Sequence, residues 1–237
     1  MNKSRGCLYL IPTPLGAFDH TLISTHNLEI IRSLDIFIVE RSKTARAFIK
    51  SCNHPKPQSA LQVFEFNNET SKQELQEMLK HISEGNNIGL MSEAGCPCVA
   101  DPGYAVVRLC HEMSINVVPL VGPSSIMLAL MASGLNGQSF VFHGYLTPKT
   151  ELLGGELLRL EKAAHSLKQT QIFIETPYRN NKLFQTLITT LHENTLVGVA
   201  ANLTQEGEWI RTLSIKKWKT ETIPDLNKIP AIFMVGG

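Results

Sequence analysis

The sequence has almost no net charge, and it has no long apolar run. Its 22 Lys and Arg residues against 21 Asp and Glu residues leave a formal charge of +1, so no overall electrostatic field indicates a nucleic acid or a membrane as partner. A local basic patch is still compatible with this balance. The longest apolar runs, 126–132 and 231–235, are far shorter than the roughly 20 residues of a membrane-spanning helix, and no membrane partner is expected.

Paired cysteines are also lacking. The five cysteines are an odd number, and the charged start of the chain does not resemble a signal peptide, so a reducing, cytoplasmic location is expected. Cys96 and Cys98 have no second cysteine pair and no histidine at ligand spacing beside them. Because a structural zinc site needs such a set, no metal is expected.

A glycine fingerprint for dinucleotides is missing as well. No G-x-G-x-x-G follows the first apolar run, 7–11, which disfavours a nicotinamide or flavin enzyme. What remains is a globular composition of 43% hydrophobic and 18% charged residues over 237 positions. This length suits one large domain or two smaller ones.

The most informative stretch is 87–104, with the sequence NIGLMSEAGCPCVADPGY. An apolar run of strand length, 88–91, ends in small residues and prolines that cannot extend a strand. The exposed amides of Ala94, Gly95 and Cys96 are suited to an anion, although an ordinary loop before a helix explains these residues equally well. The order strand, small-residue loop, helix favours a ligand site.

The rest of the chain predicts an α/β protein with two domains. In the first half, strands at 7–11, 35–39, 63–66, 88–91 and 116–120 alternate with helical patterns, which predicts a mostly parallel sheet. The second half has strands at 172–175, 196–201, 208–213 and 229–235. Their close succession predicts antiparallel pairs and a mixed sheet. We place the boundary near Leu120, giving domains 1–119 and 120–237.

Helical patterns cover 21–33, 126–132, 180–191 and a polar segment that ends near Lys168. Ser71 and Glu74 have the spacing of a capping box. The Ser124 and Ser125 hydroxyls are placed to bind a polar ligand or, more commonly for serine, to cap the next helix.

Two carboxylates are candidates for chemistry. Glu40 follows the second strand, where a general base is one interpretation and a salt bridge to Arg41 or Arg46 is an equal one. Glu175 is suited to hydrogen bonding with a cofactor. Further along, Arg179 is a candidate contact to substrate phosphate, with solvent exposure as the default alternative.

Four motifs occur in order along the chain: Pro-Thr-Pro-Leu-Gly at 12–16, Ser-Glu-Ala-Gly-Cys-Pro at 92–97 followed by Asp-Pro-Gly-Tyr at 101–104, Gly-Pro-Ser-Ser at 122–125, and Ile-Pro-Ala at 229–231. Together they resemble the tetrapyrrole methylase superfamily of S-adenosylmethionine (SAM)-dependent methyltransferases. The nearest likeness is to the ribosomal RNA small subunit methyltransferase I branch, which methylates a cytidine 2′-hydroxyl.

This resemblance implies two α/β domains with SAM in the cleft between them, in a homodimer that acts on ribosomal RNA or the small ribosomal subunit. It assigns cofactor contacts by position to Pro14, Ala94, Gly95, Cys96, Val99, Ser124, Ser125, Glu175, Ala201, Pro230 and Ala231. Glu40 and Arg179 are the residues we expect to act on the substrate.

The chain departs from the branch at positions that bear on the substrate. The branch has Glu-Asp-Thr-Arg where this chain has Glu40 followed by Arg41, Ser42 and Lys43, and Asp and Thr where this chain has Glu93 and Cys96. A Lys of the branch is replaced by Gln205. Two alternatives therefore accompany the RNA methyltransferase: an enzyme of the same fold with a small-molecule or tetrapyrrole acceptor, and a cofactor-binding module without catalysis.

Overall fold

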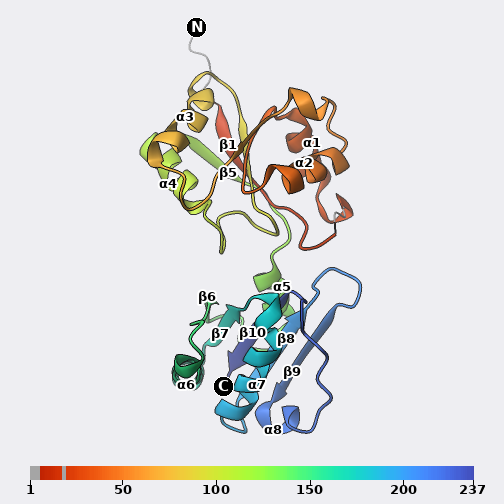
Figure 1. Cartoon of the computed structure of the whole chain (residues 1–237), viewed down its shortest axis with the longest axis vertical. Helices are drawn as coiled ribbons and strands as arrows, with labels where there is room; N and C mark the ends of the chain where they lie inside the picture. Colours follow the sequence, from red (N-terminus) through yellow and green to blue (C-terminus); the bar gives the residue numbers. More distant parts are fainter. Residues whose placement is uncertain (1–5, 18–19) are drawn as a thin grey trace. The chain divides into compact units, whose positions relative to one another are not determined.

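A computed structural model describes residues 6–17 and 20–237, and the chain divides into two compact units, residues 1–124 and 125–237 (Figure 1). Each unit has a five-stranded sheet. The division falls in the segment that joins the last strand of unit 1 to the first helix of unit 2. The boundary expected from the sequence, between residues 119 and 120, lies at the start of the same segment.

The sheet of unit 1 is parallel throughout, as the alternation of strands and helices predicts. Its strand order is β3-β2-β4-β1-β5, and every neighbouring pair is parallel. The bounds are Cys7–Ile11 for β1, Ile36–Val39 for β2, Gln62–Glu65 for β3, Ile88–Met91 for β4 and Asn116–Pro119 for β5.

Helices cover both faces of this sheet (Figure 1). They are α1 (Thr25–Ser33), α2 (Ser42–Ser51), α3 (Lys72–Ser83) and α4 (Tyr104–Glu112), with short 3₁₀ turns η1 (His20–Leu22) and η2 (Gln58–Ala60). Successive strand side chains point to opposite faces, so Phe37 packs with α1 and α2 whereas Ile38 packs with α3 and α4. Ser71 and Glu74 form the predicted capping box at the start of α3.

The sheet of unit 2 is mixed, with the order β6-β7-β10-β8-β9. β6 (Phe140–Tyr145) and β7 (Thr170–Ile174) are parallel, whereas β10 (Ala231–Gly236), β8 (Leu196–Ala201) and β9 (Trp209–Ser214) form the predicted antiparallel pairs. The sequence analysis did not predict β6.

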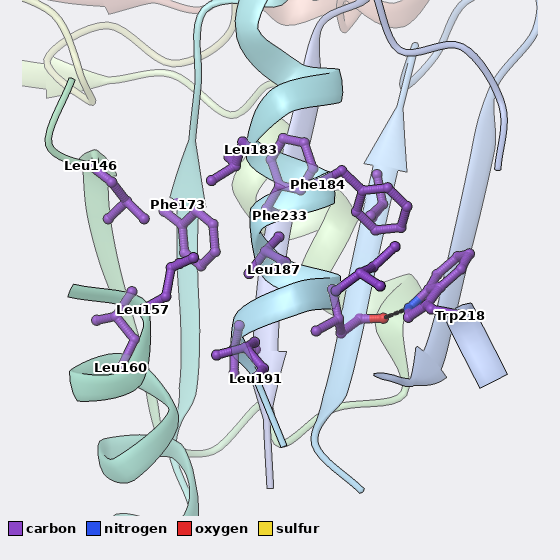
Figure 2. Close-up of a cluster of buried hydrophobic side chains, with 14 of the residues drawn as sticks. Leu146, Leu157, Leu160, Phe173, Leu183, Phe184, Leu187, Leu191, Trp218 and Phe233 are labelled. Carbon is purple, nitrogen blue, oxygen red and sulfur yellow. Dashed lines mark hydrogen bonds between the residues drawn. The ribbon is translucent and has the colours of Figure 1, made fainter. Parts of the chain in front are cut away.

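The main core of unit 2 lies on one face of its sheet (Figure 2). α6 (Thr150–Leu167), α7 (Asn180–Thr190) and the short α8 (Ile215–Trp218) contribute to it. Trp218 is fully buried and donates its indole N–H to the carbonyl oxygen of Val197 at 2.9 Å. α5 (Ser125–Ser133) contacts β8, β9 and β10, and the 3₁₀ turn η3 (Pro177–Arg179) precedes α7.

Candidate active site

The carboxyl edge of the unit 1 sheet holds a switch in chain direction. After β2 the chain moves outward to the edge strand β3, whereas after the neighbouring β4 it crosses in the opposite direction to β5. The loops that follow β2 and β4 therefore diverge. Open α/β sheets bind ligands at such a point, outside the carboxyl ends of the strands.

The loop after β4 is held in an uncommon backbone conformation. Gly95, Cys98 and Ala100 have φ angles of 76°, 70° and 62°, a region that residues other than glycine rarely occupy. Asp101 fixes this path because its carboxylate accepts hydrogen bonds from the amides of Cys98 at 2.8 Å and Gly103 at 2.6 Å. Such strained loops are typical of functional sites.

A two-residue bridge joins this loop to the segment after β1. The amide of Thr13 donates to the carbonyl oxygen of Gly95, and the amide of Gly95 donates back to Thr13, both at 3.0 Å. Of the three amides expected to receive an anion, that of Gly95 is thus used within the fold. The amides of Ala94 and Cys96 have no protein acceptor among the described residues, so they are donors suited to a ligand.

The segment that leaves unit 1 packs against the same two loops. The Cys96 thiol donates to the carbonyl oxygen of Pro123 at 3.4 Å, and a side chain at Gly122 would collide with Pro12. At Gly95, a Cβ would lie 3.0 Å from Leu15. The motifs at 12–16, 92–97 and 122–124 therefore come together in space, which fits a site that requires close approach to the backbone.

Glu40 lies next to this loop, at the end of β2. The amide of Glu93 donates to Glu40 Oε1 at 3.3 Å, and the Thr44 hydroxyl donates to Glu93 Oε1 at 2.7 Å. Burial raises the pKa of the Glu40 carboxyl, and the nearby carboxylates of Asp101 and Glu93 raise it further, against the lowering effects of the Glu93 amide and of the Arg41 charge. A raised pKa suits a carboxylate that takes up a proton near neutral pH.

The alternative interpretation of Glu40, a salt bridge to Arg41 or Arg46, is wrong. Within the described part of the chain, Glu40 forms no ion pair with Arg41 or Arg46. Arg46 instead donates to the carbonyl oxygens of Gln58 at 2.5 Å and Leu61 at 3.5 Å.

Two further residues assigned by resemblance differ in their exposure. Pro14 is buried beside the loops, whereas Val99 is 45% exposed.

A second group of candidate residues gathers at one edge of the unit 2 sheet. Strand register pairs Ala231 with Ala201, and Ile232 with Ile174, the residue before Glu175. The amide of Asn202 donates to the carbonyl oxygen of Pro230 at 3.1 Å. Four residues assigned by resemblance, Glu175, Ala201, Pro230 and Ala231, thus lie together although up to 56 positions separate them (231 − 175).

Arg179 is bound to Glu175. Arg179 Nη2 lies 2.9 Å from Glu175 Oε2, and the Glu175 side chain is only 5% exposed. The other oxygen, Oε1, accepts the amide of Thr176 at 2.7 Å. The Arg179 side chain keeps 36% of its surface exposed, so part of its guanidinium still faces solvent. Lys182 donates to Thr150 Oγ1 at 2.9 Å.

Two features of this edge were missed in the sequence. Tyr178 is 74% exposed, and Lys228 Nζ lies 6.0 Å from the centre of its ring. Asn180 is fully buried, donates to the carbonyl oxygen of Ile229 at 2.6 Å, and has a side-chain oxygen without a partner. Residues 178 and 228 are too far apart in the sequence for a local pattern to connect them, and their contact is seen only in the folded structure.

No group of histidine, cysteine or acidic residues in ranges 6–17 and 20–237 has the arrangement of a metal site. Burial raises the pKa of the Cys98 thiol to about 12, and the nearby Asp101 carboxylate and Cys110 thiol raise it as well. In the same ranges, no helix is long and apolar enough to span a membrane.

The fold is that of a class of methyltransferases. The structure superimposes on the methyltransferase CobJ with a TM-score of 0.64 at 16% identity, covering 98% of this chain and 94% of that chain. It also superimposes on the cobalamin biosynthetic enzyme cobalt precorrin-4 methyltransferase, CbiF, with a TM-score of 0.62 at 18% identity, covering 97% and 94% of the two chains.

Sequence comparison defines the family. Residues 7–218 match the model of the tetrapyrrole (corrin/porphyrin) methylases, and the chain belongs to this family. It is accordingly a SAM-dependent methyltransferase. A relative from Vibrio cholerae serotype O1, named ribosomal RNA small subunit methyltransferase I, is 30% identical over 93% of this chain and 73% of its own length. One of the same name from Escherichia coli O157:H7 is 31% identical over 88% and 69%.

Proposed function

We propose that this protein transfers a methyl group from SAM to the ribose 2′-hydroxyl of a cytidine in the RNA of the small ribosomal subunit. The observation that carries the proposal is the likeness, 30% and 31% identity over most of the chain, to relatives named ribosomal RNA small subunit methyltransferase I. This substrate places the protein in the cytoplasm, where ribosomes are found.

In unit 1, the loops after β1 and β4 would bind the amino-acid end of SAM. The amides of Ala94 and Cys96 are donors suited to its carboxylate, and Val99 offers an apolar surface to its methionine stem. Pro14, Gly95 and Ser124 complete this set. At Gly95 the adjoining space is taken by Leu15 and by the carbonyl oxygen of Pro123, so the packing of these loops depends on the missing side chain.

In unit 2, the residues that we propose for contact with SAM are Ser125 and the four at this edge, Glu175, Ala201, Pro230 and Ala231. Glu175 is a hydrogen-bond acceptor held in place by Arg179 and by the amide of Thr176. Ala201 and Ala231 are buried and small, as an adenine-binding surface requires.

For this reaction the protein has to position the two reactants and to accept one proton. SAM supplies a methyl group already activated by its sulfonium. Glu40 would accept the proton of the ribose hydroxyl, while bound SAM would supply the methyl group and remain as S-adenosylhomocysteine. Orientation can supply about 7 to 11 kcal/mol of the barrier reduction, and a positioned base contributes about 10²- to 10⁴-fold in rate.

Arg179 is proposed to contact the RNA backbone with the part of its guanidinium that faces solvent. Its remaining N–H groups are in the fixed geometry that binds phosphate oxygens well. The pairing with Glu175 would orient the side chain for this contact.

A second acceptor class has specific support. The net charge of +1 and the replacement of a lysine by Gln205 suit a small molecule, and the structural neighbours include cobalt precorrin-4 methyltransferase. The salt dependence of RNA binding distinguishes the two classes, because a protein that contacts several phosphates loses affinity steeply as salt rises.

We also propose a homodimer, which sedimentation at several protein concentrations will test.

The experiment is transfer of radiolabelled methyl from SAM. Ribosomal RNA from a strain that lacks the relevant methyltransferase, the same RNA from the parent strain, and a precorrin are offered in parallel. We expect label in the first RNA alone, in a dinucleotide resistant to alkali as a 2′-O-methyl group requires. Label in the precorrin alone would support the second class, and no label in any acceptor would contradict methyl transfer to both.

A further inference from the structure

Tyr178 is exposed beyond what a structural role needs. It keeps 74% of its surface in solvent, against 59% for Tyr145 and 55% for Tyr104, so its ring adds little to the core of unit 2. Tyrosine is enriched at contact surfaces, because its ring supplies a large apolar area and its hydroxyl a polar end.

The ring has a cation fixed beside it. Lys228 Nζ lies 6.0 Å from the ring centre, within the range of a cation–π interaction. The Lys228 backbone has a φ angle of 62°, which is uncommon for a lysine, and its amide donates to the carbonyl oxygen of Pro177 at 3.0 Å. The fold therefore maintains a strained backbone that places this lysine against Tyr178.

Hydrogen bonds on both sides keep the pair in place. The buried Asn180 amide donates to the carbonyl oxygen of Ile229. Asn181 accepts the amide of Leu226 at 2.8 Å and donates to Asp225 at 2.6 Å. The segment 225–229 is thus bound to the start of α7, and the ring and the ammonium are held ready before any ligand arrives.

The pair adjoins the residues of unit 2 that we propose for contact with SAM. Tyr178 lies three positions after Glu175 and next to Arg179, and Lys228 lies two positions before Pro230. With Lys182 exposed one helical turn further along α7, the edge combines one flat apolar ring with several cations. Single-stranded nucleic acid is bound by this combination, because bases stack on the ring while cations attract the phosphates.

We propose that Tyr178 stacks against an unpaired base of the substrate RNA and that Lys228 binds the adjoining phosphate, so that the pair positions the target nucleotide. This inference rests on the RNA methyltransferase function proposed above. It assigns the recognition of unstacked RNA to unit 2 and predicts a preference for single strands over duplex.

Binding of a short, unstructured, fluorescein-labelled oligoribonucleotide tests the proposal by anisotropy, with a duplex of the same sequence alongside. Tyr178→Ala should weaken single-strand binding about 5- to 100-fold, as loss of one stacked base does, whereas Tyr178→Phe should bind within about twofold of the parent because it keeps the ring. Lys228→Asn, which tolerates the positive φ, should weaken binding and lower the salt slope by about one.

Lys162→Ala is the matched control, because Lys162 is an exposed cation three turns along α6. Equal affinity of Tyr178→Ala and the parent protein would overturn the proposal. SAM binding, measured by calorimetry on every variant, should stay unchanged. If the parent protein methylates RNA and Tyr178→Ala does so equally well, the stacking role alone fails. If the parent binds no RNA, the proposed function fails with it.

Discussion

Two neighbouring carboxylates, Glu40 and Glu93, share the edge where β2 and β4 end, and they have different surroundings. Glu93 accepts a hydrogen bond from the Thr44 hydroxyl. Among the described residues, the hydrogen bond to the Glu40 carboxylate is the long one from the Glu93 amide. Burial and its acidic neighbours make the charged form of Glu40 less favourable. Glu40 therefore has the surroundings that suit a proton acceptor.

Glu40→Gln should lower methyl transfer about 10²- to 10⁴-fold, the usual contribution of a general base, without lowering stability. Because burial raises the pKa of Glu40 in the folded state, the folded protein binds this proton more tightly than the unfolded chain does. The protonated Glu40 carboxyl therefore stabilises the folded state at low pH. This contribution is lost as pH rises from the pKa of Glu40 in the unfolded chain through its raised pKa in the folded protein. The variant should unfold at an equal or higher temperature at neutral pH.

The pH profile of the rate is the measurement. In the parent protein the rate should rise as pH rises through the raised pKa of Glu40, and this limb should vanish in Glu40→Gln. Glu29→Gln, an exposed carboxylate on α1, serves as the control and should keep the parent profile. An unchanged rate in Glu40→Gln would remove Glu40 from the mechanism.

Arg179→Ala separates a structural role from a role in substrate binding. Removing the cation leaves the buried Glu175 carboxylate with one partner fewer, which should cost about 1 to 3 kcal/mol of unfolding free energy. In the background of Glu175→Gln the same substitution should cost much less. Chemical denaturation of the four proteins gives the coupling. A loss of RNA affinity that persists in the Glu175→Gln background supports phosphate contact, and its disappearance there would leave only the ion pair.

Among the secondary-structure elements, those with clear local signals were predicted from sequence and β6 was not. The capping residues Ser71 and Glu74 fix the start of α3, and the apolar run 88–91 fixes β4. β6 has only intermediate burial along most of its length and contains Gly144. Its pairing with β7 depends on a crossover through α6, a nonlocal contact that no local pattern reports.

The candidate site was predictable where it depends on strand ends. The sequence predicts that Glu40 follows one strand and that the Gly95 loop follows another, and the carboxyl ends of parallel strands meet at one edge. Their contact, through the amide of Glu93 and Glu40 Oε1, comes from the structure. Side-chain and backbone partners were not predictable in this way. The use of the Gly95 amide by Thr13, and the pairing of Tyr178 with Lys228, arise from contacts between segments distant in sequence.

Ser71→Ala should lower the unfolding free energy by about 1 kcal/mol, because the first turn of α3 loses its cap. The Ser71 hydroxyl accepts the amide of Glu74 and donates to its carboxylate. Ser83→Ala in the last turn of the same helix is the control and should be neutral or slightly stabilising. Thermal unfolding of both variants compares them, and an equal effect at the two positions would refute the capping role.

For the chain as a whole, each unit has its own hydrophobic core, and the proposed cofactor residues are divided between the two. The net charge of +1 gives no long-range attraction for RNA. The proposed RNA binding therefore depends on local groups, which we assign to the edge of unit 2. Family membership and the proposed site agree in requiring that the protein bind SAM.

Titration calorimetry with SAM tests this requirement most directly, on the parent protein, Gly95→Ala and Gly134→Ala. The two glycines have similar φ angles, 76° and 71°, but only at Gly95 would the new Cβ approach another residue, Leu15. We predict saturable binding of one SAM per chain in the parent and in Gly134→Ala, and affinity lower by about tenfold or more in Gly95→Ala, a loss of about 1.4 kcal/mol. Absence of saturable heat in the folded parent protein would contradict the account.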